Sequence, residues 1–318
     1  MKSSQVTASA NGWVFQVSAG IVLTLEHIRD VEKIKMEGAS EDIELTFSNG
    51  KGIYAQAKSV ERIDDTSNNL HHLKKALISL EKVSNDRMKL VYITNIRNPL
   101  NSSIPENYYS DGNYSFSSGM TMEDQAIIRR YVSSGFRFED FSVYKLYFFG
   151  EGDDAFKSIR DKIKLFLVNI NIDNSYNQKL LENWFLQYIT NCREKTLHLS
   201  KKDFIFPLIL IFIEPEISES IQEKLEISDI YDKVRARYRD LISDKAFRFE
   251  FVSKVLSDYQ KLKGSDLKET YVCNYWNQYI DEFITIDPEY VEPLIKTIIW
   301  KIIHERQLIS RVKSEVNL

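Results

Sequence analysis

Four polar side chains cluster around one turn of the chain, in the stretch EDIELTFSNGKGIYAQAKS at residues 41–59: Asp42, Glu44, Gln56 and Lys58. An acid, a Gln and a Lys in this arrangement are suited to the hydrolysis of phosphodiesters. Mg²⁺ prefers hard oxygen ligands, such as the carboxylate of Asp42 and the amide oxygen of Gln56. Such an ion activates water and stabilises charge on the phosphate, and the ammonium group of Lys58 offsets the developing charge. These residues predict a magnesium site, with Mn²⁺ as an alternative ion.

The same stretch has the pattern of a β-hairpin. Apolar and polar residues alternate on both sides of an Asn-Gly pair at 49–50, which is a strong signal for a tight turn. A loop of these two residues would place Asp42 opposite Ala57, and Gln56 and Lys58 would then face the other side. The polar groups share one face only if the loop has an odd number of residues.

Two three-residue loops satisfy this condition. A loop over 48–50, with a type I turn and a G1 bulge, puts its glycine in the left-handed conformation and Asp42 opposite Gln56. A loop over 49–51 puts Asp42 opposite Lys58. Both loops keep the apolar residues of the hairpin together, so the hydrophobic pattern favours an odd loop without choosing between the two.

Around the hairpin, the N-terminal half alternates helix and strand. Apolar spacings of three and four predict a helix over 13–29, and similar patterns predict helices near 70–80 and 121–133. The predicted strands are 33–37, 43–47, 53–60, 88–94 and 141–150. This order predicts an α/β domain over residues 1–151, with a mixed sheet flanked by helices.

The remainder, residues 152–318, has almost no strand pattern and is predicted to be an all-α domain. The expected helices lie near 153–169, 175–199, 218–226, 229–263, 269–285 and 289–315. The most apolar run, FIFPLILIFI at 204–213, has half of the ~20 residues that a membrane span needs, and it contains Pro207. We therefore expect a buried segment there and no membrane association.

Composition narrows the class of protein further. The two cysteines have no CxxC spacing, which argues against a zinc site or a disulfide framework and fits a reducing cytoplasm. The N-terminus has no apolar signal core. The formal net charge is −4, so any contact with nucleic acid must come from local basic patches. The clusters at 74–75, 129–130 and 157–164 are more typical of solvated helix faces.

Three segments together resemble the PD-(D/E)xK nuclease superfamily: GWVFQ at 12–16, EDIEL at 41–45 and the Gln-x-Lys strand at 56–58. Within it, the chain is most similar to the double-stranded DNA endonuclease domain of bacterial anti-phage systems. These systems are the CBASS-associated nucleases and the nuclease subunit of Lamassu-type defence. The resemblance covers about residues 11–95, and weakly extends to 150. It implies a restriction-endonuclease-like fold for the N-terminal domain.

The resemblance also implies roles for individual residues. Asp42 would be the metal-binding aspartate, Gln56 would replace the second acid, and Lys58 would be the catalytic lysine. Gln16 matches a helix residue that approaches the metal site in related nucleases. The activity implied is Mg²⁺-dependent cleavage of double-stranded DNA, with RNA as a lesser alternative.

The helical half departs from the CBASS nucleases, which usually carry an α/β nucleotide-sensing domain there. It is more similar to the Lamassu arrangement, in which a helical domain docks on an SMC-type ATPase subunit beside a further defence subunit. That resemblance implies a nuclease that its partners hold inactive and that works as a homo-oligomer after release.

Simpler interpretations of the same residues remain. The hairpin face could be solvated, with a cross-strand pair between Glu44 and Lys58. Glu44 and Glu37 are secondary candidates, as surface acids or acids behind the metal ligands. A catalytically inactive subunit that keeps a nuclease fold for DNA binding and assembly is the alternative function. Neighbouring histidines at 71–72 point in different directions along a helix and do not form a metal pair.

Overall fold

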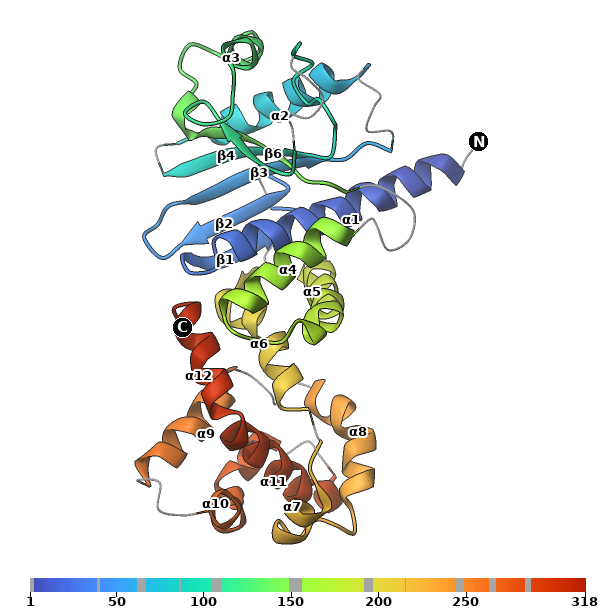
Figure 1. Ribbon diagram of the computed structural model, residues 1–318, viewed down its shortest axis with the longest axis vertical. Coiled ribbons are helices and arrows are strands. Elements are labelled where there is room, and N and C mark those ends of the chain that lie inside the picture. The colour runs from blue at the N-terminus through green and yellow to red at the C-terminus, as the bar shows by residue number, and fades with distance from the viewer. Residues whose placement is uncertain are drawn as a thin grey trace. The chain divides into compact units, whose positions relative to one another are not determined.

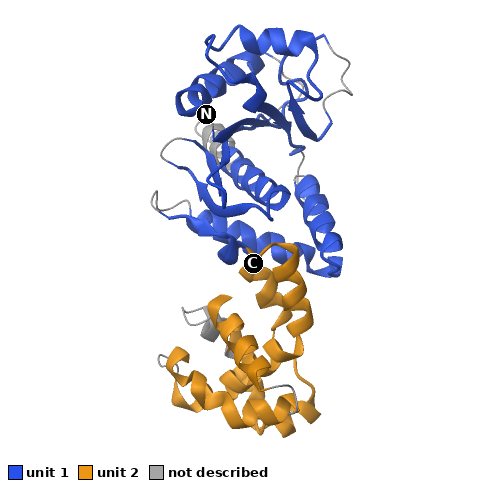
Figure 2. Ribbon diagram, turned by 90° about the vertical axis from the view of Figure 1, so that its left-hand side faces the viewer, with its two compact units in different colours: residues 1–204 blue, residues 205–318 orange. Residues whose placement is uncertain are grey.

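The computed structural model describes residues 3–38, 41–61, 67–85, 87–103, 110–148, 156–191, 197–214, 216–243, 249–262, 267–283 and 287–318. It divides into two compact units, residues 1–204 and 205–318 (Figure 2). Unit 1 contains a sheet with helices on both faces, and unit 2 is helical (Figure 1). An α/β part followed by a helical part was predicted from the sequence, and this coarse arrangement is confirmed.

The sheet of unit 1 has seven strands in the order β5-β6-β4-β3-β2-β1-β7. Strands β3, β4 and β6 run parallel to one another, and the remaining neighbours are antiparallel, so the sheet is mixed as predicted. The short strands β5 and β7 at the two edges were not predicted. The strand bounds are β1 (Val31–Met36), β2 (Ile43–Phe47), β3 (Gly52–Lys58), β4 (Met88–Thr94), β5 (Gly112–Ser115), β6 (Phe141–Lys145) and β7 (Leu199–Ser200).

Helices cover both faces of this sheet. Helix α1 (Ser3–Glu26) packs on one face, against β1, β2 and β3. Helices α2 (Asn69–Val83) and α3 (Met122–Arg129) cover the other face (Figure 1). The core between α2 and the sheet is built on Leu73, Leu77, Leu80, Leu90 and Tyr92, all with 0% exposure. Burial on both faces explains why β4 has an almost continuous apolar sequence.

The hairpin between β2 and β3 selects one of the two predicted loops. Glu44 pairs with Tyr54 in the ladder, and Phe47 donates its N–H to the carbonyl of Lys51 at 2.7 Å. The loop is therefore 48–50, and its glycine, Gly50, has a φ of 75°. A residue with no Cβ adopts this left-handed conformation without steric cost, as the G1 bulge requires.

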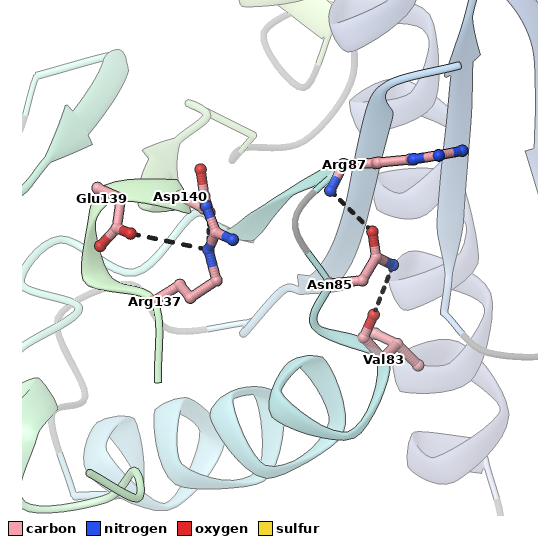
Figure 3. A network of polar contacts seen from close by, with 6 residues as sticks. All are labelled: Val83, Asn85, Arg87, Arg137, Glu139 and Asp140. Carbon is pink, nitrogen blue, oxygen red and sulfur yellow. Dashed lines mark hydrogen bonds and ion pairs between the residues drawn. The ribbon is translucent and has the colours of Figure 1, made fainter. Parts of the chain in front are cut away.

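A short polar turn leads from α2 into β4 (Figure 3). The side chain of Asn85 accepts a hydrogen bond from the Arg87 N–H at 2.9 Å and donates one to the Val83 carbonyl at 3.2 Å. These bonds satisfy backbone groups at the end of the helix. The turn returns the chain so that β4 lies parallel to β3, which brings the carboxyl ends of both strands to one edge of the sheet.

The rest of unit 1 is helical and packs on α1. The hydroxyl groups of Tyr188 in α5 (Asn177–Asn191) and Thr24 in α1 share a hydrogen bond of 2.7 Å, which links the two helices. Unit 1 thus includes helices that the sequence assigned to the part beginning at residue 152. These helices are α4 (Lys157–Asn169) and α5 (Asn177–Asn191), and α6 (Lys201–Phe212) spans the boundary between the units.

The remaining helices belong to unit 2. One helix was predicted over 289–315. The structure instead has two helices there, α11 (Pro288–His304) and α12 (Arg306–Glu315). The bounds are α7 (Glu219–Lys224), α8 (Tyr231–Ser243), α9 (Phe249–Lys261), α10 (Lys268–Tyr275), α11 (Pro288–His304) and α12 (Arg306–Glu315). Among the described residues, no helix has the length and apolar character needed to cross a bilayer.

Candidate active site

Two adjacent acids just before β2 reach different helices. Glu41 accepts a hydrogen bond from the Gln56 amide of β3, and it accepts a second one from the Ser79 hydroxyl of α2 at 3.1 Å. Its side chain is almost fully buried, with 3% exposure. A buried carboxylate needs such donors to replace the hydrogen bonds that it made to water.

Asp42 lies half-buried next to Glu41, but its hydrogen bonds lead elsewhere. Its carboxylate accepts the Ala57 N–H of β3 at 2.9 Å and also accepts a hydrogen bond from the side chain of Gln16 in α1. The Gln16 position identified from the sequence is therefore in contact with Asp42. The acids Glu41 and Asp42 bridge β3 to the helices on the two faces of the sheet.

The turn between β1 and β2 explains this divergence. The Glu37 N–H donates to the Asp42 carbonyl at 2.8 Å, and the Gly38 N–H donates to the Glu41 carbonyl at 3.0 Å. Both acids therefore belong to the turn rather than to β2, which starts at Ile43. Strict alternation would place Asp42 on the face of Gln56; instead, Glu41 makes the contact with Gln56, because alternation does not hold in a turn.

Lys58 is exposed at the carboxyl end of β3, where it pairs with Thr94 in the ladder. Its positive charge acts on the Asp42 carboxylate, where it favours the ionised form. The same charge acts on His72 of α2, where it contributes to a lowered pKa after the larger effect of burial. The charge of Lys58 therefore reaches both Asp42 and His72.

The pKa values of both acids are raised. Burial raises the pKa of Asp42, against hydrogen bonds from Ala57 and Gln16. Burial also raises the pKa of Glu41, and the negative charges of Asp42 and Glu44 raise it further. Burial thus disfavours the ionised form of both carboxylates, and at Glu41 the negative charges nearby add to this effect.

The oxygen donors near this turn are of the chemical type that Mg²⁺ accepts. Carboxylates and an amide oxygen are the hard ligands that Mg²⁺ and Mn²⁺ prefer, and water and phosphate oxygens complete its octahedron. Within the described ranges, no group of three or more His, Cys, Asp and Glu side chains forms a metal cluster. Glu41, Asp42 and Gln56 include only two acidic side chains, so they do not form such a group of three.

The secondary candidates flank this site. Glu44 pairs with Tyr54 in the ladder, and its carboxylate lies against Gly38, where an added Cβ would overlap with it. Glu44 acts on Glu41 through its charge. Glu37 has a positive φ of 48° at the turn, which marks it as a residue that shapes the β1–β2 connection.

Glu41 is the site residue that sequence reasoning missed. Strand alternation along 41–47 predicts that Glu41 shares the apolar face of Ile43 and Leu45. No function was therefore assigned to this acid from the sequence. That conflict was itself a signal, since an acid at a predicted core position requires hydrogen-bonding partners. Ser79, which binds it, lies on the polar side of an ordinary amphipathic helix and has no distinguishing pattern in the sequence.

No protein-family model, no curated protein and no solved structure matches this chain.

Proposed function

We propose that this protein is a metal-dependent endonuclease that cleaves double-stranded DNA, with a restriction-endonuclease-like domain in unit 1. The observation that supports this proposal is the cluster at one end of the β2–β3 hairpin. There Glu41 accepts a hydrogen bond from the Gln56 amide, the adjacent Asp42 accepts the Ala57 N–H of the same strand β3, and the charge of Lys58 acts on Asp42.

Each side chain has a distinct task in this mechanism. Asp42 and Gln56 would hold Mg²⁺, which when bound supplies charge stabilisation at the phosphate and activates water. The Lys58 ammonium group donates a hydrogen bond toward the attacking oxygen or the scissile phosphate, where negative charge develops. Gln16 and the Ala57 N–H fix the Asp42 carboxylate, so its orientation does not depend on the substrate.

The proposed biological setting follows from the resemblance to anti-phage nucleases. In that setting the chain is the cytoplasmic effector subunit of a Lamassu-like complex. An SMC-like ATPase subunit and a further defence subunit would restrain it, and it would act as a homo-oligomer after release.

One observation favours the alternative of an inactive subunit used for DNA binding and assembly. Gln56, Glu41 and Ser79 satisfy one another by hydrogen bonds, and Glu41 is buried. A closed network of this kind also stabilises a hairpin without any catalysis.

Cleavage of supercoiled plasmid with Mg²⁺ tests the proposal, with the wild type beside Lys58→Ala. We expect the wild type to cut and the variant to lose about 10²–10³-fold in rate, because a charge that stabilises the transition state is removed. Lys51→Ala is the matched control, since Lys51 is an exposed lysine at the loop end of the same hairpin.

Chelation by EDTA should abolish cleavage by the wild type. If neither Mg²⁺ nor Mn²⁺ gives cleavage by the wild type after its partners are removed, the inactive-subunit alternative replaces the nuclease. Equal losses in Lys58→Ala and Lys51→Ala would remove Lys58 from the catalytic group.

A further inference from the structure

Two adjoining pockets lie on unit 2, between helices α9 and α12. Their volumes are about 560 and 370 Å³, and both are lined by Gln260 of α9 and Ser310 of α12. Arg306 and Arg311 line the first pocket, and Lys313 lines the second. Arg306 and Lys313 are seven residues apart, which is about 10 Å along a helix, so these cations line an extended groove rather than one point.

Neutral partners hold two of these cations in place. The Arg306 guanidinium donates to the Ile303 carbonyl at 3.1 Å and lies 5.9 Å from the ring centre of Tyr259. The Lys313 ammonium donates to the Ser253 hydroxyl at 3.3 Å and lies 5.4 Å from the ring centre of Phe249. Carbonyls, hydroxyls and rings orient a cation without cancelling its charge.

Two acids near the groove have cationic partners that do not line it. Asp258 of α9 forms an ion pair with Lys261 at 2.9 Å, and Glu305 lies 3.7 Å from Lys301. Among the described residues, no acidic side chain lines either pocket. Arg306 and Lys313, both held by neutral groups, therefore present positive charge in the groove of a chain whose net charge is −4.

The chemistry of the lining identifies the kind of ligand. Besides the cations, it consists mainly of serine hydroxyls and glutamine amides, with only two leucines. Cations, hydroxyls and amides are the side chains that contact DNA phosphates. A protein partner would instead need buried aromatic or aliphatic anchors. We propose that this groove binds the phosphate backbone of duplex DNA, an inference that rests on the proposed function for its ligand.

Binding of a fluorescent 30-base-pair duplex to the full chain tests this proposal, by anisotropy in EDTA across a series of salt concentrations. EDTA prevents cleavage, so the measurement does not require an active site. The variant Arg306→Gln/Lys313→Gln should lower the slope of log affinity against log salt by about 1 to 2, because up to two phosphate contacts are lost. Its affinity at low salt should fall about tenfold or more.

The matched control is Lys224→Gln/Lys233→Gln, which removes the same charge from α7 and α8 of the same unit. A third variant, Ser310→Glu, adds a carboxylate at an exposed position of the groove and should weaken binding without disturbing the core. Thermal unfolding of all variants separates loss of binding from loss of fold.

Unchanged affinity and salt slope in both groove variants would overturn the proposal, and so would equal losses in the control pair. Groove-dependent binding of a poly-glutamate peptide, without groove-dependent binding of the duplex, would assign the groove to an acidic protein segment instead. Groove-dependent binding of the duplex by a protein that never cleaves would leave the groove in place and overturn only the nuclease.

Discussion

The hydrogen bond between Glu41 and Gln56 determines which way the Gln56 amide points. An ionised carboxylate only accepts hydrogen bonds, so the NH₂ end of the amide must face Glu41. The amide oxygen is then directed away from Glu41, as the proposed role of Gln56 as a metal ligand requires. Ser79 fixes Glu41 in turn, at 3.1 Å. In the proposed metal site, Glu41 would therefore be a positioning residue that acts through Gln56.

We expect Glu41→Gln to weaken Mn²⁺ binding and to slow cleavage by about 10–100-fold, the usual effect of losing a partner behind a metal ligand. Calorimetric titration with Mn²⁺ measures the affinity independently of activity. The exchange Glu41→Gln/Gln56→Glu restores an amide–carboxylate pair and should recover much of the affinity. Glu32→Gln, at an exposed position on β1, is the control. Wild-type Mn²⁺ affinity in Glu41→Gln would contradict the positioning role.

The raised pKa of Asp42 links the site to stability. Burial places the folded-state pKa above the unfolded value, so the folded chain binds more protons between the two values. Stability therefore falls as pH rises through this window and remains lower at neutral pH. Asp42→Asn removes the buried charge and should raise the urea midpoint at pH 7 in EDTA, with a smaller gain once the pH falls below the folded-state pKa of Asp42.

The second part of this test compares the stability of the wild type and of Asp42→Asn with and without Mg²⁺. The ion should stabilise the wild type and leave Asp42→Asn almost unchanged, because only a protein that binds the ion gains stability from it. Asp30→Asn, at an exposed position in the turn after α1, is the control. A variant less stable than the wild type at pH 7 in EDTA would show that Asp42 is a structural acid.

At the scale of elements, two glycines set the geometry of the hairpin in different ways. Gly50 has a φ of 75° and open space around it, whereas a Cβ on Gly52 would lie 2.0 Å from the Leu45 carbonyl oxygen. Gly50→Ala should cost about 1 kcal/mol of unfolding free energy from backbone strain, and Gly50→Asn less. Gly52→Ala should cost more, about 2 kcal/mol or above, because the backbone of β2 must move. Urea unfolding of the three variants measures this order, and a larger loss in Gly50→Ala would contradict it.

The sequence predicted the hairpin well because two independent signals agreed. The Asn-Gly pair located the turn, and the apolar alternation of β2 required an odd loop. Choosing between loops 48–50 and 49–51 needed the backbone, since both give the same hydrophobic face. The mixed order of the central strands was also predictable, because a helix-length segment separates β3 from β4.

Other elements gave weaker signals. The edge strands β5 and β7 have four and two residues, too short for a visible alternation. Helix α6 contains Pro207 inside a continuous apolar run, and neither feature indicates a helix. The contact between Glu41 and Gln56 depends on a turn that breaks the strand period. Periodicity cannot locate a residue at such a position.

At the scale of the whole molecule, charge limits how a single copy meets DNA. The chain has 46 acidic and 42 basic residues, and so repels a polyanion on average. Under the proposed function, binding to DNA would have to come from local regions, such as Lys58 in unit 1 and the groove of unit 2. Several copies acting on one duplex would multiply these weak local contacts by raising the effective concentration of each site.

This reasoning leads to a prediction about concentration. If the active form is a homo-oligomer, the initial rate of plasmid cleavage should rise more steeply than linearly with protein concentration. We expect a log–log slope near 2 or above, and light scattering should detect the assembly over the same range. Added salt should lower the rate and the assembly on DNA together, because both depend on screened charges. A log–log slope of 1, from a protein that light scattering shows to be a monomer, would mean that one chain is the complete nuclease. Lys58 and the groove of unit 2 would then have to supply all of its affinity for DNA.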